Sequence, residues 1–479
     1  MSLSEREIQA IMQRVQSRVG GASRTGPEII VRSIDEQRLG IFRDIDSAVT
    51  AARRAFEQYE RLSLDARKVI IAAMREKMRQ YGTELAHEAH EETGLGRSED
   101  KIKKNALVTD KTPGPEILAT EAWSGDHGLT IVERAPFGVF AAITPTTNPT
   151  STIINNSISI LSAGNSVCFN VHPNARRVSA RNIQLLNQAI QSAGGPANLI
   201  TAIAEPTIES AQALMRHPLV RILLVTGGGG VVTEAMRSGK RAITAGPGNP
   251  PVVVDETADI ELAGEKVVFG ASFDNNVICT DEKEVFVVDN VADALKAAMQ
   301  RHGAYLVERS HEVRRLEETI FREMAGPFGV SKMRNEWIGK NAGAILQAAG
   351  INAPRDVRLA LVEVPLEHTL VWTEQMMPVM PLVRLPSVDQ CIDQAVKAEH
   401  GFGHTASMFS KHLDHLSRMA REINVSIFVK NGPTLAGLGY GGEGFTSFSI
   451  ASPTGEGMTT ALSFSRPRRC TLVDHFRIV

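Results

Sequence analysis

The chain has 479 residues, of which 43% are hydrophobic and 22% charged, and its formal net charge is −2. This length predicts more than one globular domain. The nearly neutral charge argues against nucleic acid as a partner, and no apolar run approaches the roughly 18–20 residues of a membrane span. The four cysteines (Cys168, Cys279, Cys391 and Cys470) are widely spaced and form no metal-ligand pattern. We therefore expect no metal site, and free thiols in a reducing, cytoplasmic compartment.

The N-terminal segment predicts a helix of its own. Ser4 and Glu7 have the spacing of a capping box, and apolar residues then recur at helical intervals as far as Val19. We therefore expect an amphipathic helix over residues 1–20 and a flexible, glycine-bearing linker over 21–28. Because an isolated helix of this length is marginally stable, it docks either on its own domain or on a partner surface.

The next part of the chain alternates between helical and extended patterns. Residues 46–107 have the periodicity of long helices, and 127–136 reads as a short strand that ends at a proline. From 138 to 256, helical stretches separate the strand-like runs GVFAAITP, SVCFNVHP, NLITAIAE, RILLVTGG and PVVVDE. This alternation predicts a parallel sheet with helices on both faces, in which ligands bind beyond the carboxyl ends of the strands.

Residues 260–430 alternate in the same way, so the fold class is α/β with two doubly wound domains. We place the first domain at 29–250 and the second at 251–433. A return segment and tail follow at 434–479. The end of the tail, RPRRCTLVDHFRIV, reads as a strand, which we expect to be held by pairing with another subunit.

Two polar turns follow strands of the first domain. TGGGG (226–230) lies between a strand and a helix, where glycines let backbone N–H groups approach a phosphate, although a permissive turn also accounts for it. ITPTTNPTST (143–152) contains Asn148, whose amide donors can stabilise a developing oxyanion without titrating. An Asn-Pro turn accounts for that residue as well.

Cys279 lies in the polar turn FDNNVICT, just before the apolar strand EVFVV. A free cysteine is usually a small buried hydrophobe, but the polar turn and its position at the start of the second domain favour a catalytic thiol. No histidine is close in sequence, so the base that would deprotonate Cys279 is not identified. The glycine- and hydroxyl-rich segment 447–459 reads either as a substrate-pocket loop or as a surface loop.

Taken in order, GVFAAITPTTNP, LLVTGGGG, FDNNVICT, EQMMPV and ASMFSK resemble the aldehyde dehydrogenase superfamily, from about residue 45 to the end. FDNNVICTDEKEVFVV and TAGPGNPPVVVD more closely resemble its CoA-acylating members of propanediol and ethanolamine utilisation, which work inside bacterial microcompartments. This resemblance implies an aldehyde dehydrogenase-like fold with a small oligomerisation element, formed by a hairpin at 127–136 and the tail.

The resemblance also implies roles for single residues. Cys279 matches the nucleophile, and Asn148 matches the side-chain member of an oxyanion hole whose other member is the backbone N–H of Cys279. Glu374 matches the carboxylate that binds the nicotinamide ribose, and His172 stands where hydrolytic members have a lysine near the adenosine ribose. The other implied cofactor contacts are Thr144, Pro145, Thr146, Pro173, Thr226, Gly227, Gly228, Val231 and Gly246.

One departure from the hydrolytic members matters. They carry a glutamate that activates water in the segment that here reads AGPGNPP, with Ala245 or Gly246 at that place. An acyl-cysteine thioester without a nearby general base should hydrolyse slowly, and would then be taken by the thiol of coenzyme A.

The resemblance therefore implies an NAD-dependent, CoA-acylating dehydrogenase that converts propionaldehyde to propionyl-CoA through a thioester on Cys279, with ping-pong kinetics. Three enzymes stay open as alternatives: an acetaldehyde-preferring enzyme, an acyl-phosphate reductase of the same superfamily, and an acyl-CoA reductase that runs the reaction in reverse. A scaffold protein that has lost the chemistry is a fourth alternative. The helix at 1–20 would bind a microcompartment shell protein in the cytoplasm, and the enzyme would be a homodimer or homotetramer.

Overall fold

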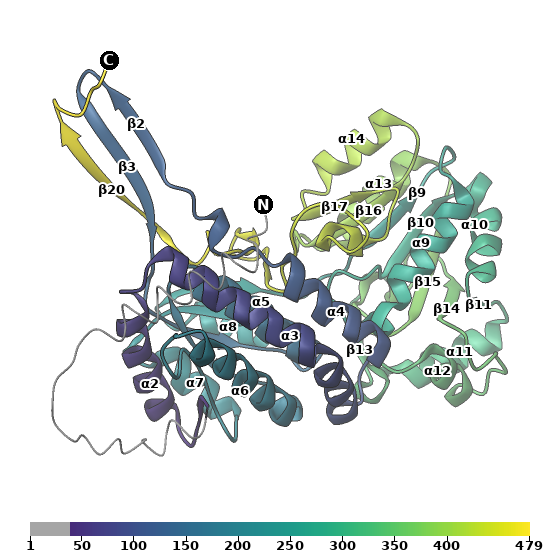
Figure 1. Ribbon diagram of the computed structural model, residues 1–479. Helices are drawn as coiled ribbons and strands as arrows, with labels where there is room; N and C mark the ends of the chain where they lie inside the picture. Colours follow the sequence, from purple (N-terminus) through teal and green to yellow (C-terminus); the bar gives the residue numbers. More distant parts are fainter. Residues whose placement is uncertain (1–38) are drawn as a thin grey trace. The chain divides into compact units, whose positions relative to one another are not determined.

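The computed structural model describes residues 39–479, so the expected helix at 1–20 and linker at 21–28 lie outside the described residues. The chain divides into two compact units, each with a large sheet (Figure 1). Unit 1 takes the described part of Met1–Glu88 together with Lys104–Ala245 and Ser447–Val479, and unit 2 takes Ala89–Lys103 and Gly246–Thr446. The predicted boundaries at 250 and 433 compare with 245 and 446 in the structure.

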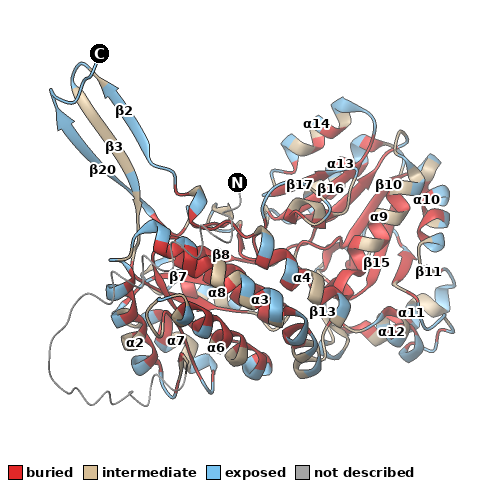
Figure 2. Ribbon diagram, in the orientation of Figure 1, coloured by how far each residue is buried: buried red, intermediate tan, exposed pale blue. Residues whose placement is uncertain are grey.

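Unit 1 contains a six-stranded parallel sheet with the order β1-β6-β5-β4-β7-β8. Its strands are β1 Ile41–Phe42, β4 Val139–Ile143, β5 Ser166–Asn170, β6 Ile200–Ile203, β7 Val220–Thr226 and β8 Arg241–Ala245. Its helices include α2 Ile45–Tyr59, α5 Pro149–Ser162, α6 Arg176–Ser192, α7 Ile208–Arg216 and α8 Gly229–Met236. Every residue of β4 and β5 is buried, as expected for a parallel sheet that is covered on both faces. In Figure 2 the strands of both large sheets are mostly red, the colour of buried residues. The alternation therefore predicted this sheet correctly, apart from β1 and β8, which it missed.

The order of the strands creates a switch point at β4. From β4 the chain continues to β5 on one side and returns to β7 on the other side. In register, Ile143 of β4 pairs with Asn170 of β5 and with Val225 of β7. Because parallel strands end at a common edge, the turns after β4, β5 and β7 lie next to one another there, where open α/β sheets bind ligands.

Unit 2 contains a seven-stranded parallel sheet with the order β11-β14-β15-β10-β9-β16-β17. Its strands are β9 Pro251–Val254, β10 Glu284–Val288, β11 Ala304–Val307, β14 Leu359–Glu363, β15 Val379–Leu385, β16 Thr405–Phe409 and β17 Ile427–Lys430. Its helices include α9 Ile260–Ser272, α10 Asp289–Arg301, α11 Ser310–Ile320, α12 Ala342–Ala348, α13 Val388–Ala398 and α14 Leu413–Glu422. Grouping PVVVDE with the first region was wrong, because this run forms β9 in the second sheet.

Apolar clusters on both faces hold the second sheet. Phe286 and Val288 of β10 belong to one cluster, whereas Val285 and Val287 belong to the other. Successive side chains of a strand point to opposite faces, so a strand with helices on both sides needs apolar residues at every position. This requirement explains the unbroken run EVFVV.

The remaining strands form small antiparallel pairs and one three-stranded sheet. In the latter, β3 Gly128–Ala135 lies between β2 Glu121–Gly125 and β20 Arg466–Val473 (Figure 1). The predicted strands at 127–136 and in the tail are thus present. The tail, which we expected to pair with another subunit, pairs with β3 of the same chain. The short pairs are β12 Phe321–Glu323 with β13 Lys332–Met333, and β18 Ile450–Ala451 with β19 Gly457–Met458.

The predicted helix-rich region contains α2, α3 Leu64–Thr93 and α4 Ser98–Lys111. Each of the first two begins at a polar cap, because Asp44 accepts from Ser47 N at 2.8 Å and Ser63 Oγ accepts from Ala66 N at 3.2 Å. No helix within residues 39–479 is long and apolar enough to cross a bilayer.

Asn165 joins three parts of unit 1 through its buried amide. Its Oδ1 accepts from the backbone N–H groups of Phe137 and Gly138, at 2.7 and 3.1 Å. Its Nδ2 donates to Ile160 O at 3.2 Å and to Phe464 O at 2.8 Å. One side chain therefore ties the start of β4 to the end of α5 and to the return segment.

Replacing Asn165 with Ala should destabilise unit 1 by about 3 kcal/mol, because buried backbone donors and acceptors would lose their partners. The measurement is the urea midpoint of the transition that unfolds unit 1. Gln188→Ala, which removes an exposed amide from α6, is the matched control and should shift that midpoint little. Equal midpoints for the two variants would contradict this role of Asn165.

Candidate functional site

The turn before Cys279 has an unusual backbone. Asp274, Asn275 and Asn276 follow one another with φ of 44°, 55° and 64°. The left-handed region is unfavourable for residues with a Cβ, and Asp and Asn are among those that enter it most readily. Three such residues in a row persist only where the surroundings fix them.

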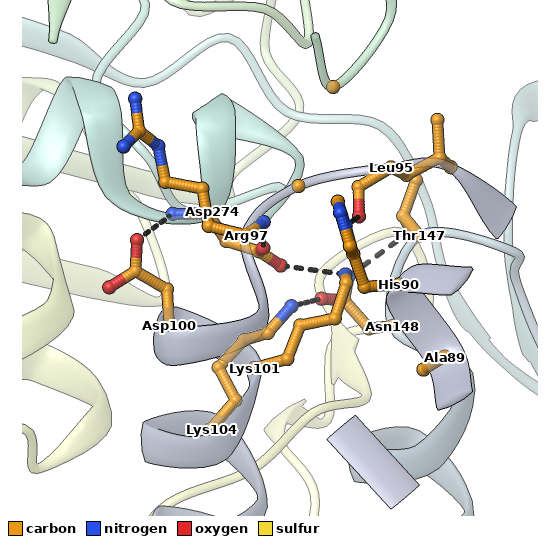
Figure 3. A network of polar contacts seen from close by, with 12 residues as sticks. Ala89, His90, Leu95, Arg97, Asp100, Lys101, Lys104, Thr147, Asn148 and Asp274 are labelled. Atoms are coloured by element: carbon orange, nitrogen blue, oxygen red, sulfur yellow. Dashed lines mark hydrogen bonds and ion pairs between the residues drawn. The ribbon is translucent and has the colours of Figure 1, made fainter. Parts of the chain in front are cut away.

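Buried polar groups of unit 2 fix the first of these residues. Asp274 accepts from the backbone N–H of Arg97 at 2.6 Å and forms an ion pair with Lys101 Nζ at 3.0 Å (Figure 3). Its own N–H donates to Asp100 Oδ2 at 3.0 Å. A Cβ at Gly96 would lie 1.9 Å from Asp274 Oδ1, so only glycine leaves room for this carboxylate.

The two asparagines are held in the same way. Nδ2 of Asn275 donates to Gly339 O at 2.9 Å and to Asn341 Oδ1 at 3.0 Å. Nδ2 of Asn276 donates to the carbonyl oxygens of Ala271 and Glu282, each at 2.9 Å. The FDNN sequence therefore builds the turn that presents Cys279.

In the described stretch 270–288, every residue is buried except Cys279, which is partly exposed. Cys168 and Cys391 are buried, and Cys470 is exposed on β20. Cys279 is thus the one residue of this otherwise closed stretch that is partly exposed.

Four segments that contain predicted or candidate site residues lie at one edge of the sheet of unit 2. His404 directly precedes β16, and Gly248, Cys279 and Glu374 lie three to five residues before β9, β10 and β15. Parallel strands begin at a common edge. A Cβ at Gly248 would lie 2.8 Å from Cys279 O and 3.1 Å from His404 Cγ. The Cys279 backbone and the His404 ring therefore both lie so close to Gly248 that a side chain at this position would clash with them.

Burial dominates the electrostatics of this edge. It raises the pKa of the Cys279 thiol to about 12; the Glu374 carboxylate raises it further, while the Lys283 cation lowers it. Burial, together with Lys283, lowers the pKa of His404 to about 4, so this imidazole is neutral at pH 7. Nδ1 of His404 lies 2.8 Å from Thr405 Oγ1, and Nε2 has no partner in the described structure. His404 is therefore a neutral imidazole and a weak base at this edge.

In unit 1, Asn148 begins α5 but does not cap it. It stands at the N-cap position, yet its side chain bonds no backbone N–H of the helix. Oδ1 accepts from the buried Lys104 Nζ at 2.5 Å, and Nδ2 donates to Thr147 Oγ1 at 3.1 Å (Figure 3). The bond from Lys104 fixes which end of the Asn148 amide carries the N–H donors. A residue that only forms an Asn-Pro turn would not explain this orientation.

The turns at the switch point bring together most of the other predicted residues. Thr144, Pro145 and Thr146 follow β4, and Thr144 N donates to Asn170 O, the last residue of β5, at 3.4 Å. His172 and Pro173 follow β5 directly. The Thr144 hydroxyl is buried without a partner in the described residues, as expected for a group that awaits a ligand.

The glycine turn after β7 is open. Gly228 is the N-cap of α8, and a Cβ at Gly228, Gly229 or Gly230 would meet no atom of the chain within 4 Å. The fold itself therefore leaves space where these glycines stand, and backbone N–H groups at a helix N-terminus suit a pyrophosphate. Gly227 differs, because a Cβ there would lie 2.9 Å from Val231 Cγ1. These residues fit a dinucleotide.

The segment 447–459 is buried at its start, whereas Pro453 and Gly455 in its middle are exposed. Ser447 and Ser449 are buried. Ser449 Oγ lies 2.8 Å from Thr226 Oγ1, at the glycine turn, and donates to Asn156 Oδ1 at 2.9 Å. The return segment therefore supports the nucleotide turn.

The predicted residues divide between the units: Gly246, Cys279 and Glu374 belong to unit 2 and the others to unit 1. His404 was missed because it lies 125 positions after Cys279, and only the parallel order of β9, β10 and β16 brings the two segments together. One feature of the sequence could have indicated His404: like Cys279, it lies just ahead of a run that forms a buried strand. Within residues 39–479 no group of three or more His, Cys, Asp or Glu side chains is arranged to bind a metal.

Comparisons with known proteins agree with this geometry. A profile of the aldehyde dehydrogenase family matches residues 33–315. The acetylating acetaldehyde dehydrogenase of Salmonella typhimurium is 45% identical over the full length of both chains. The Rhodopseudomonas palustris propionaldehyde dehydrogenase, solved with CoA and an acylated cysteine, is 46% identical with a TM-score of 0.88, covering 91% of this chain and 98% of that one. A propionaldehyde dehydrogenase from the Clostridium phytofermentans fucose utilisation microcompartment is 44% identical with a TM-score of 0.89, covering 92% and 100%.

The raised pKa of Cys279 predicts how its reactivity depends on pH. Below the pKa the thiolate fraction grows about tenfold per pH unit, so alkylation by iodoacetamide should still be accelerating between pH 7 and pH 9. The measurement is the rate of modification of the Cys279 peptide, followed by mass spectrometry, with the exposed Cys470 as the internal control. A plateau for Cys279 below pH 8 would contradict the burial effect.

Proposed function

We propose the following function for this chain, which belongs to the aldehyde dehydrogenase family: it oxidises propanal with NAD⁺ and coenzyme A and releases propanoyl-CoA and NADH. Cys279 carries this proposal, because it is the one partly exposed residue of a buried turn. Acetaldehyde is the alternative substrate, since the full-length relative from Salmonella typhimurium is an acetylating acetaldehyde dehydrogenase.

The first step forms a bond between Cys279 Sγ and the aldehyde carbon. Cys279 reacts as the thiolate, its proton having passed to solvent, and the carbonyl oxygen becomes an oxyanion. We assign the backbone N–H of Cys279 and the Asn148 amide as its donors, by resemblance to the family. Lys104 supports that assignment, because its bond to Oδ1 fixes which atom of the amide is the oxygen and which carries the N–H donors.

By resemblance to the family, we propose which residues of each unit contact the nicotinamide cofactor. In unit 1 the turn at Thr226, Gly227 and Gly228 would hold the pyrophosphate, and in unit 2 Glu374 would bind the nicotinamide ribose. When bound, the nicotinamide ring accepts a hydride from the former aldehyde carbon. Cys279 then carries the acyl group as a thioester.

No carboxylate in the segment AGPGNPP can activate water, so the thioester on Cys279 should hydrolyse slowly. The thiolate of coenzyme A then attacks the acyl carbon, and the Cys279 thiolate leaves and is restored. We propose that His172 and Pro173 contact the coenzymes at the edge of unit 1, where Thr144 presents its unpaired hydroxyl. Acyl transfer to a second substrate gives ping-pong kinetics.

NADH formation from propanal and NAD⁺ should require coenzyme A. Without it, a burst of about one NADH per active site should appear, because Cys279 is acylated once and not released. Absorbance at 340 nm with and without coenzyme A is the measurement. Cys279→Ala should abolish both phases and retain NAD⁺ binding, whereas the control Cys470→Ala should behave like the unmodified enzyme. Sustained turnover without coenzyme A would overturn the thiol-acceptor assignment.

We further propose that residues 1–20 bind a shell protein of a bacterial microcompartment, and that the chain works inside such a compartment. Support comes from the amphipathic pattern of these residues and from the relative of the Clostridium phytofermentans microcompartment. We also propose a homodimer or homotetramer, since the outer edges of β2 and β20 stay unpaired within the described chain.

Deleting residues 1–20 should leave aldehyde oxidation unchanged and abolish co-purification with microcompartment shells. The two readouts are NADH formation by the purified variant and the amount of enzyme in isolated shells, with the full chain as control. A loss of activity would show instead that this segment is part of the catalytic fold.

A further inference from the structure

A lysine lies completely buried beneath the turn of Cys279. Lys283 directly precedes β10 and has no exposed surface. Its Nζ donates to Asn276 Oδ1 at 2.6 Å and to the backbone oxygens of Asn276 and Ile278, at 3.3 and 3.2 Å. All these acceptors are neutral, and Lys283 forms no ion pair within the described residues. An unpaired buried cation is costly, so its retention calls for a function.

The bond to Ile278 O reaches the peptide group that contains the Cys279 N–H. Ile278 O also accepts from Asp281 N at 3.1 Å, so two donors act on this one carbonyl. A charged donor on a carbonyl polarises the peptide, and its N–H becomes a stronger donor. The N–H so affected is the backbone group assigned to the oxyanion.

The charge of Lys283 also acts on the groups around it. It lowers the pKa of the Cys279 thiol, against burial and the carboxylates of Glu374 and Asp281, which raise it. It opposes the burial that raises the pKa of Glu374, and it adds to the burial that lowers the pKa of His404. Lys283 thus favours a thiolate beside a neutral imidazole.

The titratable neighbours Glu282 and Glu284 are acids, so they cannot supply the positive charge of Lys283. Burial raises the pKa of Glu282 to about 7 and that of Glu284 well above the usual range, and Lys283 opposes both shifts. Glu282 accepts from Thr434 N at 2.8 Å. Neither oxygen of Glu284 has a partner in the described residues.

We propose that Lys283 is a positioning residue for the reaction: its ammonium group polarises the Ile278–Cys279 peptide and favours the Cys279 thiolate, while its hydrogen bonds hold the turn. This inference rests on the proposed function, in which Cys279 is the nucleophile. If the role of Lys283 were purely structural, its charge would not matter. Any side chain that donates hydrogen bonds to Asn276 and Ile278 would then replace it without loss of rate.

Three variants of the full-length enzyme separate charge from hydrogen bonding. Lys283→Gln keeps an amide donor without the charge, Lys283→Met removes both, and Lys283→Arg keeps the charge. Lys296→Gln, which removes a lysine that pairs with Glu363 on the surface of unit 2, is the matched control. Each variant is assayed for cooperative thermal unfolding, for iodoacetamide alkylation of Cys279 at pH 7 to 9, and for the NADH burst with propanal and NAD⁺.

We expect Lys283→Gln to unfold cooperatively, with alkylation of Cys279 and the burst each at least tenfold slower at pH 7, which corresponds to a thiol pKa higher by about one unit or more. The burst should recover as the pH rises, and Lys283→Arg should restore part of both rates. If Lys283→Met does not fold, the comparison of Gln with Arg decides.

Alkylation and burst rates of Lys283→Gln equal to those of Lys296→Gln would overturn the inference and leave a structural lysine. Equal losses in the Gln and Arg variants would overturn it as well, because charge would then not matter. Failure of the proposed function looks different: Cys279→Ala would keep its burst, whatever the Lys283 variants do.

Discussion

Between α9 and β10 the backbone passes through three left-handed residues, and the chemistry of unit 2 depends on that turn. Asp274, Asn275 and Asn276 tolerate this conformation because their side chains bond to backbone groups and to a buried lysine. Without the turn, Cys279 would continue the buried run that precedes it. Sterically unfavourable dihedral angles are thus balanced by the hydrogen bonds of these three side chains, and Cys279 follows them as the one partly exposed residue of the stretch.

The same interior holds several acids at this edge through bonds to the backbone. The buried carboxyl groups are engaged with the backbone: Glu282 accepts from Thr434 N, Glu399 from His404 N at 2.8 Å, and Glu374 from the N–H of Gly248. Burial raises the pKa of all three, which makes them poor partners for a charged intermediate. These acids therefore hold the loops of this edge in place.

The alternation of apolar runs and helical stretches predicted both parallel sheets, because strands covered on both faces must be apolar throughout. It missed β1, of two residues, and β8, whose RAITA begins with an exposed arginine. Cys279 and the glycine turn were recognisable from local sequence. His404 and Lys104 were not, since their meaning comes from contacts across 44 or more positions that no local pattern contains. The segment FDNN carries part of the family resemblance. Only the positive φ angles of Asp274, Asn275 and Asn276 explain why Asp and Asn stand at these positions.

The division of the chain has a consequence for its synthesis. Unit 1 is built from three separate stretches, and its last strand, β20, pairs with β3 more than 330 positions earlier. Asn165 likewise bonds Phe464 O. A ribosome must therefore finish almost the whole protein before unit 1 can close, whereas unit 2 is fully synthesised by Thr446. The usual order in which the N-terminal domain folds first is reversed, and the first unit waits with an incomplete interior, which exposes apolar surface to chaperones during translation.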